Sequence, residues 1–561
     1  MSNKDDGFPD KLSATSINHC WLWIDQCIKS HEQCKVSNRH TGRRQTTSEL
    51  YPSRIIDVSA DPPRLCLTKD FAPGVRYATL SHCWGTSYSK KHLLKRGKLK
   101  MFQRSLPMSD LPKTFREAIS FTQKVLTKYD VKYLWIDSLC IIQNSKRDWL
   151  EESARMASVY SNAFCNLAAT ASSDGSGGLF YPRHTNMAHY AVVKLDVPVL
   201  DEPNTGPRKS NAEDCIITVA DQWERVIQDS PLNQRAWVVQ ERILSPRTIH
   251  FAEDMLYWQC TSHTASEDLH HGRLKIAELS EQDCKELVQS LPAETFSSPD
   301  DIRSTWKQIV ERYMKCKITY SDDRLQAFSG IAALFQRHFK DSKYHAGLWG
   351  DQLERQLLWR TLRSEREEMQ IVLSAQRTAG APSWSWASSD CPVNIVWYDQ
   401  TERLLMSILK IEISLAGTDA YGRTTSARLS LRCIPIFGKG RELARFPFEF
   451  ETMFGIDFMP FWFDMDDKNY KKPDNIVCCV PVLCTVTEKR CVCSGLVLES
   501  TGATFGEYRR IGVFLWDTDE KQSFRHSLEE VKRVFLEWSD KQSLYRGGER
   551  EPNGECVISV V

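Results

Sequence analysis

The sequence predicts an α/β protein whose amino-terminal half contains a parallel, doubly wound sheet core. Three short apolar runs, residues 77–81, 131–136 and 164–170, alternate with segments whose apolar residues recur every three or four positions. A strand–helix–strand–helix–strand order at this spacing is typical of parallel crossovers. From Ser383 onward the apolar period shortens toward two, which indicates a β-rich carboxyl-terminal region.

Length and composition narrow the class of protein. At 561 residues the chain is too long for one core, so we expect two or three domains. The 73 basic and 72 acidic side chains nearly cancel, which argues against a nucleic-acid partner. No apolar run reaches about 18 residues, so no membrane span is expected. The start, MSNKDDGFPDKLSATS, lacks an apolar signal segment, and the 19 cysteines are therefore expected to be reduced in a cytoplasmic protein.

The pattern divides the chain into four segments. We expect an amino-terminal helical segment (1–45), an α/β domain (46–260, core 77–170), a mainly helical region (261–382) and a β-rich region (383–561).

The amino-terminal segment contains a short helical candidate, residues 20–34, that carries Cys27, His31 and Cys34. This C-x3-H-x2-C spacing could place three metal ligands on one helical face. A structural zinc site normally has four ligands, and the sequence offers no obvious fourth. We therefore predict no metal and a plain helix. The residues expected to pack in that helix are Trp21, Ile24 and Ile28.

The core places its polar residues directly after its strands. The first run stops at His82-Cys83-Trp84-Gly85, where Gly85 is the breaker, and Asp137 ends the second run. One helix-period pattern, residues 115–129, separates these strands, and another, residues 149–163, precedes the third. Ligands of parallel sheets bind beyond the carboxyl ends of the strands. The segments expected to form one functional site are residues 81–85, 137–140 and 169–173.

Further elements are expected after the core. The pattern predicts a helix over residues 232–244, ended by Ser245-Pro246, and an amphipathic helix over residues 324–335. The strand candidates are residues 248–251, 256–260, 394–397, 406–415, 427–434, 495–498 and 511–516, and a late helix is expected at 528–538.

Three long blocks occur in one order along the chain. They are YATLSHCWG at residues 77–85, LWIDSLCIIQNSKRDWLEESARMASVYSNA at 134–163 and RAWVVQERILSPRTIHF at 235–251. Together these blocks resemble the fungal heterokaryon-incompatibility (HET) domain family over roughly residues 50–260. Many members carry Ser-Tyr-x where this chain has Ser81-His82-Cys83. This difference bears on the subgroup to which the chain is assigned more than on its membership of the family.

The resemblance carries expectations about fold and function. It implies a TIR-like, flavodoxin-like sheet core and a role in fungal non-self recognition, where HET proteins trigger cell death after incompatible cells fuse. It also implies protein partners in incompatibility signalling and leaves self-association open. Some TIR domains cleave NAD, so NAD is a candidate substrate and no resident cofactor is expected. The alternatives are an NAD glycohydrolase, a catalyst in a specialised-metabolite pathway, or an interaction module whose β-rich half binds the partner.

Three residues are candidates for catalysis. Glu152, near the start of the helix after Asp137, resembles the helix-borne catalytic glutamate of NAD-cleaving TIR domains, and could stabilise the positive charge of a breaking glycosidic C–N bond. It could equally favour the first turn of its helix and pair with Arg155. Asp137 could bind ribose hydroxyls or orient His82, or it could cap the following turn. His82 could transfer protons, or it could be a core histidine bonded to a carbonyl.

Six further residues are candidates for ligand binding, because they belong to the strand-end segments or to the third block. They are Ser81, Trp84, Gly85, Cys140, Arg235 and Glu241. Each has a structural alternative: Trp84 could plug the sheet end, Arg235 could pair with Glu241, and Cys140 is by default a buried, inert thiol. A Cys140–His82–Asp137 nucleophile is therefore disfavoured. The sequence contains no G-x-G-x-x-G after a strand, Walker loop, H-E-x-x-H or G-x-S-x-G, so it predicts none of the enzymes that those motifs mark.

Overall fold

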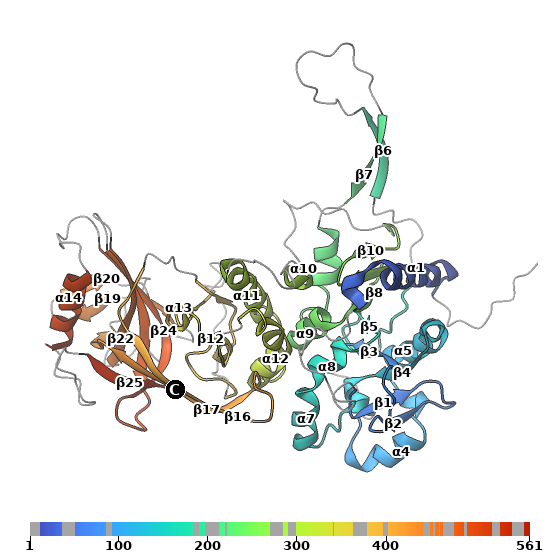
Figure 1. The fold of residues 1–561 in the computed structure, drawn as a ribbon, viewed down its shortest axis with the longest axis horizontal. Coiled ribbons are helices and arrows are strands. Elements are labelled where there is room, and N and C mark those ends of the chain that lie inside the picture. Colours follow the sequence, from blue (N-terminus) through green and yellow to red (C-terminus); the bar gives the residue numbers. More distant parts are fainter. Residues whose placement is uncertain are drawn as a thin grey trace, which may run out of the picture. The chain divides into compact units, whose positions relative to one another are not determined.

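The computed structural model divides the chain into two compact units, Met1–Pro292 and Ala293–Val561 (Figure 1). The predictions for residues 1–11, 36–45 and Trp397 lie outside the residues that the structure describes. The described residues are 12–35, 51–85, 92–182, 190–196, 212–218, 221–269, 284–289, 299–339, 342–362, 379–396, 402–440, 449–452, 455–458, 461–463, 476–486, 491–518, 528–540 and 555–561.

Unit 1 is built on an eight-stranded sheet in the order β10-β9-β8-β5-β3-β4-β1-β2. Its four central strands, β8, β5, β3 and β4, are parallel, and antiparallel strands extend the sheet on both sides. The predicted parallel core is therefore confirmed, whereas its TIR-like or flavodoxin-like character stays a prediction. The strands are β1 Arg54–Asp57, β2 Arg64–Leu67, β3 Arg76–Ser81, β4 Val131–Trp135, β5 Cys165–Ala168, β8 Arg247–Phe251, β9 Leu256–Cys260 and β10 Thr264–Ser266.

The helices that connect the parallel strands are interrupted more often than the sequence periodicity predicts. The first predicted helix is α5 Lys113–Lys124 followed by a 3-10 turn, Leu126–Tyr129, which ends at Asp130 with φ 59°. The second corresponds to two short helices, α7 Lys146–Ser153 and α8 Met156–Ser161, and a further short helix, α6 Asp137–Cys140, follows β4 before them. Between α7 and α8 the Arg155 N–H bonds the Glu152 carbonyl at 3.0 Å, an i→i−3 contact that interrupts the α-helical pattern.

Strand β3 is the point where the sheet changes direction. The chain leaves β3 for β4 on one side and returns to β5 on the other side, and β5 is then followed in the sheet by β8. In open α/β sheets, ligands bind beyond the carboxyl ends of neighbouring strands whose connections diverge. The ends of β3 and β5 are therefore the binding edge that this topology favours.

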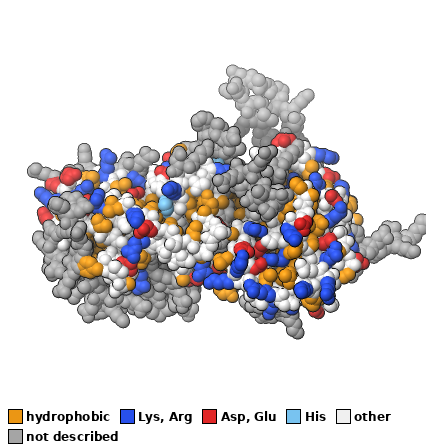
Figure 2. Space-filling model, turned by 60° about the horizontal axis from the view of Figure 1, so that its bottom comes forward, with side chains coloured by type: hydrophobic (Ala, Val, Ile, Leu, Met, Phe, Trp, Pro, Cys, Tyr) orange, Lys and Arg blue, Asp and Glu red, His pale blue; other side chains and the backbone are white. Residues whose placement is uncertain are grey.

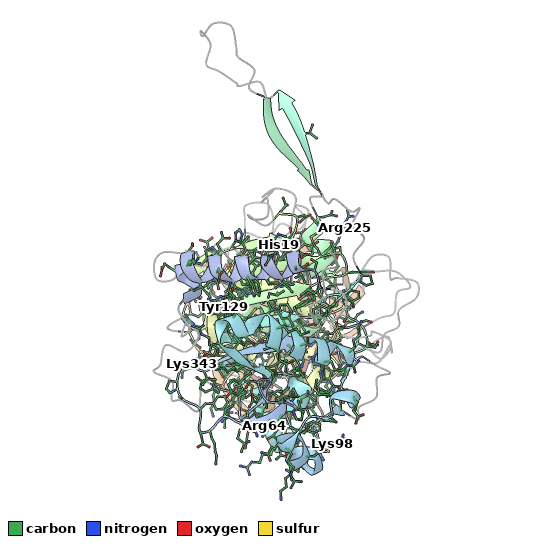
Figure 3. All side chains as sticks on the ribbon, turned by 90° about the vertical axis from the view of Figure 1, so that its right-hand side faces the viewer. His19, Arg64, Lys98, Tyr129, Arg225 and Lys343 are labelled. Atoms are coloured by element: carbon green, nitrogen blue, oxygen red, sulfur yellow. The ribbon has the colours of Figure 1, made fainter. Side chains whose placement is uncertain are left out.

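Two amino-terminal helices, α1 Ala14–Ser30 and α2 Glu32–Lys35, pack beside strand β9. The rings of Trp23 in α1 and Trp258 in β9 stack at 6.3 Å, and Figure 3 shows α1, which carries His19, lying across the unit. Of the predicted packing residues Trp21, Ile24 and Ile28, Ile24 is buried and the other two are half-buried. Trp21 is half-buried and its indole N–H donates to the Val125 carbonyl, whereas Trp23 is buried.

Unit 1 also contains α4 Leu99–Arg104, the hairpin strands β6 Tyr190–Asp196 and β7 Ala212–Thr218, α9 Ala236–Leu244 and α10 Cys284–Gln289. Helix α9 and strands β8 and β9 agree with the predicted helix over 232–244 and the predicted strands at 248–251 and 256–260. The β1–β2 hairpin was not among the predicted strands.

Unit 2 contains α11 Pro299–Met314 and α12 Arg324–Phe335, which pack around the buried Trp306, and then a large, mainly antiparallel sheet. The sequence thus predicts α12 and the β-rich region correctly. The remaining elements are α13 Leu353–Gln356, α14 Leu528–Asp540, β11 Tyr344–His345, β12 Leu348–Trp349, β13 Arg360–Thr361, β14 Val393–Asn394, β15 Arg403–Leu404, β16 Ser407–Leu415, β17 Thr424–Cys433, β18 Ile436–Gly440, β19 Glu449–Thr452, β20 Gly455–Phe458, β21 Phe461–Phe463, β22 Ile476–Val486, β23 Cys491–Ser500, β24 Glu507–Thr518 and β25 Cys556–Val560.

The surface carries charges of both signs. On the face that Figure 2 shows, basic and acidic side chains of the described residues are interspersed, as the net charge of +1 suggests. Within the described ranges, no helix combines the length and the apolar character that crossing a membrane requires.

Candidate functional site

Three polar side chains meet where β3, β5 and helix α9 approach one another. Ser81 is the last residue of β3, Asn166 lies in β5, and Glu241 lies in α9. The Ser81 hydroxyl donates to Glu241 Oε2 at 2.5 Å, and the Asn166 amide donates to Ser81 Oγ at 3.0 Å. The Thr79 hydroxyl completes the chain of bonds at 2.9 Å from Asn166 Oδ1. We call Ser81, Asn166 and Glu241 the strand-end cluster.

Glu241 supplies the carboxyl group of the strand-end cluster. Its side chain is buried, and loss of solvation raises its pKa from 4.5 to about 7. The hydroxyl of Ser81 and the charge of Arg235 oppose that rise, and the nearby Asp137 carboxylate adds to it. Near neutral pH this carboxyl group therefore exists in both protonation states, which suits a group that exchanges protons with a ligand.

His82 and Asp137 form a second pair beside this cluster. His82 Nε2 lies 3.7 Å from Asp137 Oδ1, and burial lowers the pKa of His82 to about 4 despite the attraction of that carboxylate. The imidazole is therefore neutral at physiological pH. The Trp84 indole N–H donates to Asp137 Oδ2 at 2.9 Å, and the Ser138 amide donates to Asp137 Oδ1 at 2.6 Å. Asp137, the first residue of α6, thus accepts a hydrogen bond from the next amide of that helix and faces His82 at the same time.

Arg235 and Gly85 set the path of the chain after β3. The Arg235 guanidinium donates to the His82 carbonyl, which links the start of α9 to the end of β3. Gly85 has φ +70°, and a Cβ there would lie 2.6 Å from Asp174 Cβ. A side chain at position 85 would therefore meet both backbone strain and a steric clash.

The cysteines near this edge are poor nucleophiles. Burial raises the pKa of the Cys83 and Cys140 thiols, so both are protonated at neutral pH. Cys83 packs with Ala168, Leu232 and Val238, and the Cys140 carbonyl accepts a hydrogen bond from Arg54 Nε at 2.6 Å. Both cysteines have the packing role that the sequence favours.

Glu152 is not where the sequence places it. It lies in the last turn of α7 rather than near the start of that helix, because α7 begins at Lys146 and ends at Ser153. Its buried carboxylate accepts the Ser53 N–H at 3.4 Å and lies 3.9 Å from Arg155 NH1. These contacts belong to the β1 side of the sheet, so the catalytic role of Glu152 stays a prediction without support from the strand-end cluster.

The strand-end segments converge as the order of elements predicts. Of the predicted site residues, the structure brings Ser81, His82, Trp84, Asp137, Arg235 and Glu241 into one polar region. Two residues of this region were not among the predicted site residues. They are Asn166, and Tyr160, which is within hydrogen-bonding reach of Glu241. A signal for Asn166 was present, because it is the single amide in the otherwise apolar run FCNLAAT.

The chain matches a known family model over part of its length. Residues 77–241 match the family described as Heterokaryon incompatibility protein (HET), a segment that begins in β3 and ends at Glu241 of the strand-end cluster. The match confirms the family resemblance over the first two sequence blocks and over residues 235–241 of the third. Comparisons with curated proteins and with solved structures gave no match.

Proposed function

Because residues 77–241 form a HET domain, we propose that this protein acts in fungal heterokaryon incompatibility and triggers cell death after non-self cells fuse. The family match is the observation that carries this proposal. The strand-end cluster supports it, since the matched segment includes every residue that builds the cluster. Protein partners and self-association, which the resemblance implies, are part of the proposal.

Inducible expression of the full chain in a filamentous fungus tests this function. We expect loss of viability or of hyphal growth with the wild type, and a much weaker effect with Glu241→Ala, which removes the acceptor of the Ser81 hydroxyl. Glu151→Ala is the matched control, because Glu151 is an exposed glutamate in α7 that pairs with Arg147. Normal growth at high expression, including in contact with a non-self strain, would contradict the proposal.

A second function is favoured by the ionisation of Glu241. A buried carboxyl group with a pKa of about 7 is suited to proton transfer or to stabilising positive charge. In hydrolysis of NAD, the C–N bond between ribose and nicotinamide breaks, water forms the new C–O bond, and a proton is released. The products are nicotinamide and ADP-ribose.

Incubation of the purified full chain and its variants with NAD distinguishes the roles of the two candidate carboxylates, Glu241 and Glu152. If Glu241 acts, Glu241→Gln should lower the rate of nicotinamide release by roughly 100-fold or more, whereas Glu152→Ala should leave it near the wild-type value. The reverse pattern would assign the reaction to Glu152. No nicotinamide release, even under conditions that cluster the protein, would rule out this second function and leave the incompatibility role standing.

A further inference from the structure

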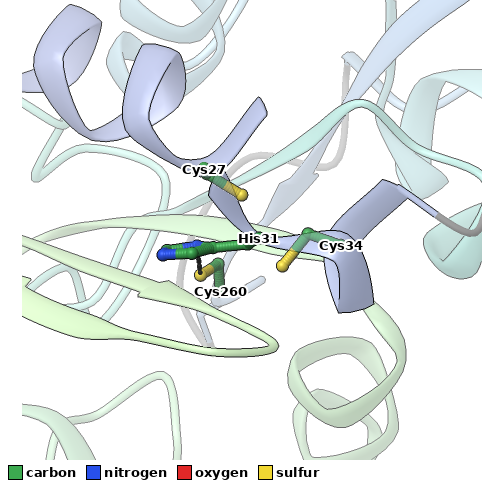
Figure 4. Close-up of side chains that lie close together, drawn as sticks. All are labelled: Cys27, His31, Cys34 and Cys260. Carbon is green, nitrogen blue, oxygen red and sulfur yellow. Dashed lines mark hydrogen bonds between the residues drawn. The ribbon is translucent and has the colours of Figure 1, made fainter. Parts of the chain in front are cut away.

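Four side chains able to bind a metal meet where α1 and α2 contact the β9–β10 hairpin. They are Cys27, His31, Cys34 and Cys260, and Figure 4 shows them facing one another. Their ligand atoms all lie within 4.8 Å of one another, and His31 Nδ1 is 3.3 Å from Cys260 Sγ. In a tetrahedral zinc site with one imidazole and three thiolates, ligand atoms are roughly 3.3–3.8 Å apart. Small shifts would bring these four side chains to that geometry.

The backbone is folded to bring the first three ligands together. On a continuous helix, residues 27 and 34 would be about 10 Å apart along the axis, too far for both sulfurs to reach one ion. The chain instead leaves the helix at His31, with φ −100° and ψ 89°, and starts the new helix α2 at Glu32. The break occurs in the sequence SHEQCK, which contains neither glycine nor proline. A shared ligand gives this break a physical reason.

The fourth residue comes from a distant hairpin. Cys260 is the last residue of β9, and its backbone N–H donates to the His263 carbonyl at 2.9 Å in the turn to β10. The Ser262 N–H, two residues after the cysteine, points at Cys260 Sγ at 3.4 Å. An amide in this position stabilises a thiolate, so the turn is suited to present its sulfur to a metal.

The surroundings also compensate the charge of a metal site. Three thiolates and one divalent ion would leave one net negative charge among side chains that are largely buried, with Cys27 at 0%, Cys260 at 1% and Cys34 at 7% exposure. The buried guanidinium of Arg247 donates to Cys27 Sγ at 3.2 Å and to the Cys34 carbonyl at 3.3 Å. One positive charge thus lies directly against the sulfur cluster.

We propose that Cys27, His31, Cys34 and Cys260 bind one structural zinc ion that ties the amino-terminal helices to the edge of the sheet. Three thiolates and one imidazole favour zinc, and four protein ligands leave no position open for water, as in structural rather than catalytic sites. The sequence prediction of no metal rested on the lack of a fourth ligand, and Cys260 fills that place. Neither the HET match nor the strand-end cluster involves this site.

Metal analysis of the purified full chain tests the proposal directly. After purification in reductant without added metal, we expect about one zinc per chain, and close to none in Cys260→Ser. Cys20→Ser is the matched control, because Cys20 is equally buried on the same helix but outside the group of four. Cys484→Ser controls for the three-thiol group Cys484, Cys491 and Cys493 of unit 2. Zinc retained in Cys260→Ser and lost in Cys484→Ser would overturn the assignment.

Cobalt substitution keeps the test decisive if the serine variant fails to fold. Cobalt in the wild type should give the visible absorption of a tetrahedral site and the intense near-ultraviolet bands of thiolate ligation. His31→Cys should still bind one metal ion and shift these bands, because it converts the set to four thiolates, whereas His31→Ala should bind metal much more weakly. A folded, reduced wild type that binds neither zinc nor cobalt would refute the site. A disulfide among Cys27, Cys34 and Cys260 in protein purified without reductant and without metal would refute it as well.

Discussion

Glu241 and His82 respond to burial in opposite directions. Desolvation raises the pKa of the glutamate from 4.5 to about 7 and lowers the pKa of the histidine from 6.5 to about 4. Both groups are therefore held in their neutral forms at mildly acidic pH. Their effects on stability have opposite signs, so a variant of one residue is needed to separate them.

We expect Glu241→Gln to change how stability depends on pH. Between pH 4.5 and about 7 the folded wild type holds a proton on Glu241 that the unfolded chain has lost, so stability falls as pH rises through this window. Glutamine does not titrate. The stability of the wild type relative to Glu241→Gln should therefore fall by roughly 3 kcal/mol between pH 4 and pH 8, measured by denaturant unfolding.

The His82 contribution is present in both proteins and cancels in this comparison. Ser81 and Arg235 favour the charged carboxylate and Asp137 disfavours it, so Ser81→Ala should move the Glu241 midpoint to still higher pH. A pH-independent difference between wild type and Glu241→Gln would show that Glu241 ionises normally.

The positions of these site residues could be predicted from the sequence, but the pKa shifts of Glu241 and His82 could not. The strand ends identified Ser81, His82 and Asp137, and the third block identified Glu241 as a ligand candidate. The shifted pKa of Glu241 depends on how completely α9 covers it, which no local pattern reports. Asn166 was missed because a polar residue inside a strand is not marked by the strand-end rule.

At the scale of elements, the end of β3 depends on the backbone of Gly85. We expect Gly85→Ala to lower the free energy of unfolding by about 2 kcal/mol or more, since alanine would meet left-handed strain and the Asp174 side chain. Asp174 is held by its own bonds to Ser176, so it cannot move away freely. Thermal or denaturant unfolding measures the loss.

Variants of two other glycines distinguish the cost of backbone strain from the cost of the steric clash. Gly74 has φ +91° with nothing within 4 Å of an added Cβ, so Gly74→Ala should cost about 1 kcal/mol from strain alone. Gly97 has neither feature, and Gly97→Ala should be close to neutral. Equal effects at Gly85 and Gly74 would show that the Asp174 contact is unimportant.

In helix α1 the prediction from the sequence and the structure differ on which tryptophan is buried, and mutation of each can test this. Trp23 is 1% exposed and stacks on Trp258, whereas the predicted core residue Trp21 is half-buried. We expect Trp23→Ala to destabilise unit 1 by about 3–5 kcal/mol. Trp21→Ala should cost less, since it loses one hydrogen bond and partial burial. A larger effect at Trp21 in the unfolding curves would restore the sequence prediction.

The elements themselves were predictable where their pattern is local. Residues 324–335 and the core strands follow period and turn signals, and the structure agrees. The interruptions at Glu152–Arg155 and at His31 were not predictable, because neither glycine nor proline marks them in the sequence.

At the scale of the whole molecule, the two units should differ in their dependence on the last strand. Strand β25 pairs with β17 on one side and with β24 on the other, so it lies inside the sheet of unit 2. Deleting residues 555–561 should unfold much of unit 2 and leave unit 1 folded. Limited proteolysis with mass analysis should then show a protected fragment that ends near residue 292.

Loss of protection in both units would show that they fold as one cooperative body. The point mutant Val560→Asp, which places a charge at a buried position of β25, provides a milder version of the same test.

The pairing of elements that are far apart in the chain could not be predicted from the sequence. The parallel strands β3, β4 and β5 follow from local alternation, but the position of β8 beside β5 and of β9 beside α1 involves segments far apart in the chain. For this reason the sequence alone did not indicate that Cys260 lies beside the amino-terminal cysteines.

The distance along the chain between α1 and its partner strand has a consequence for biosynthesis. His31 and Cys260 are 229 positions apart, so a ribosome that adds 5–20 residues per second needs roughly 10–50 s to make the second after the first. During that interval the nascent helix lacks the β9 residues Trp258 and Cys260, which contact Trp23 and His31 in the folded unit. Oxidation or chaperone capture in that window would compete with correct assembly, so the order of translation makes the amino terminus the last part of unit 1 to be secured.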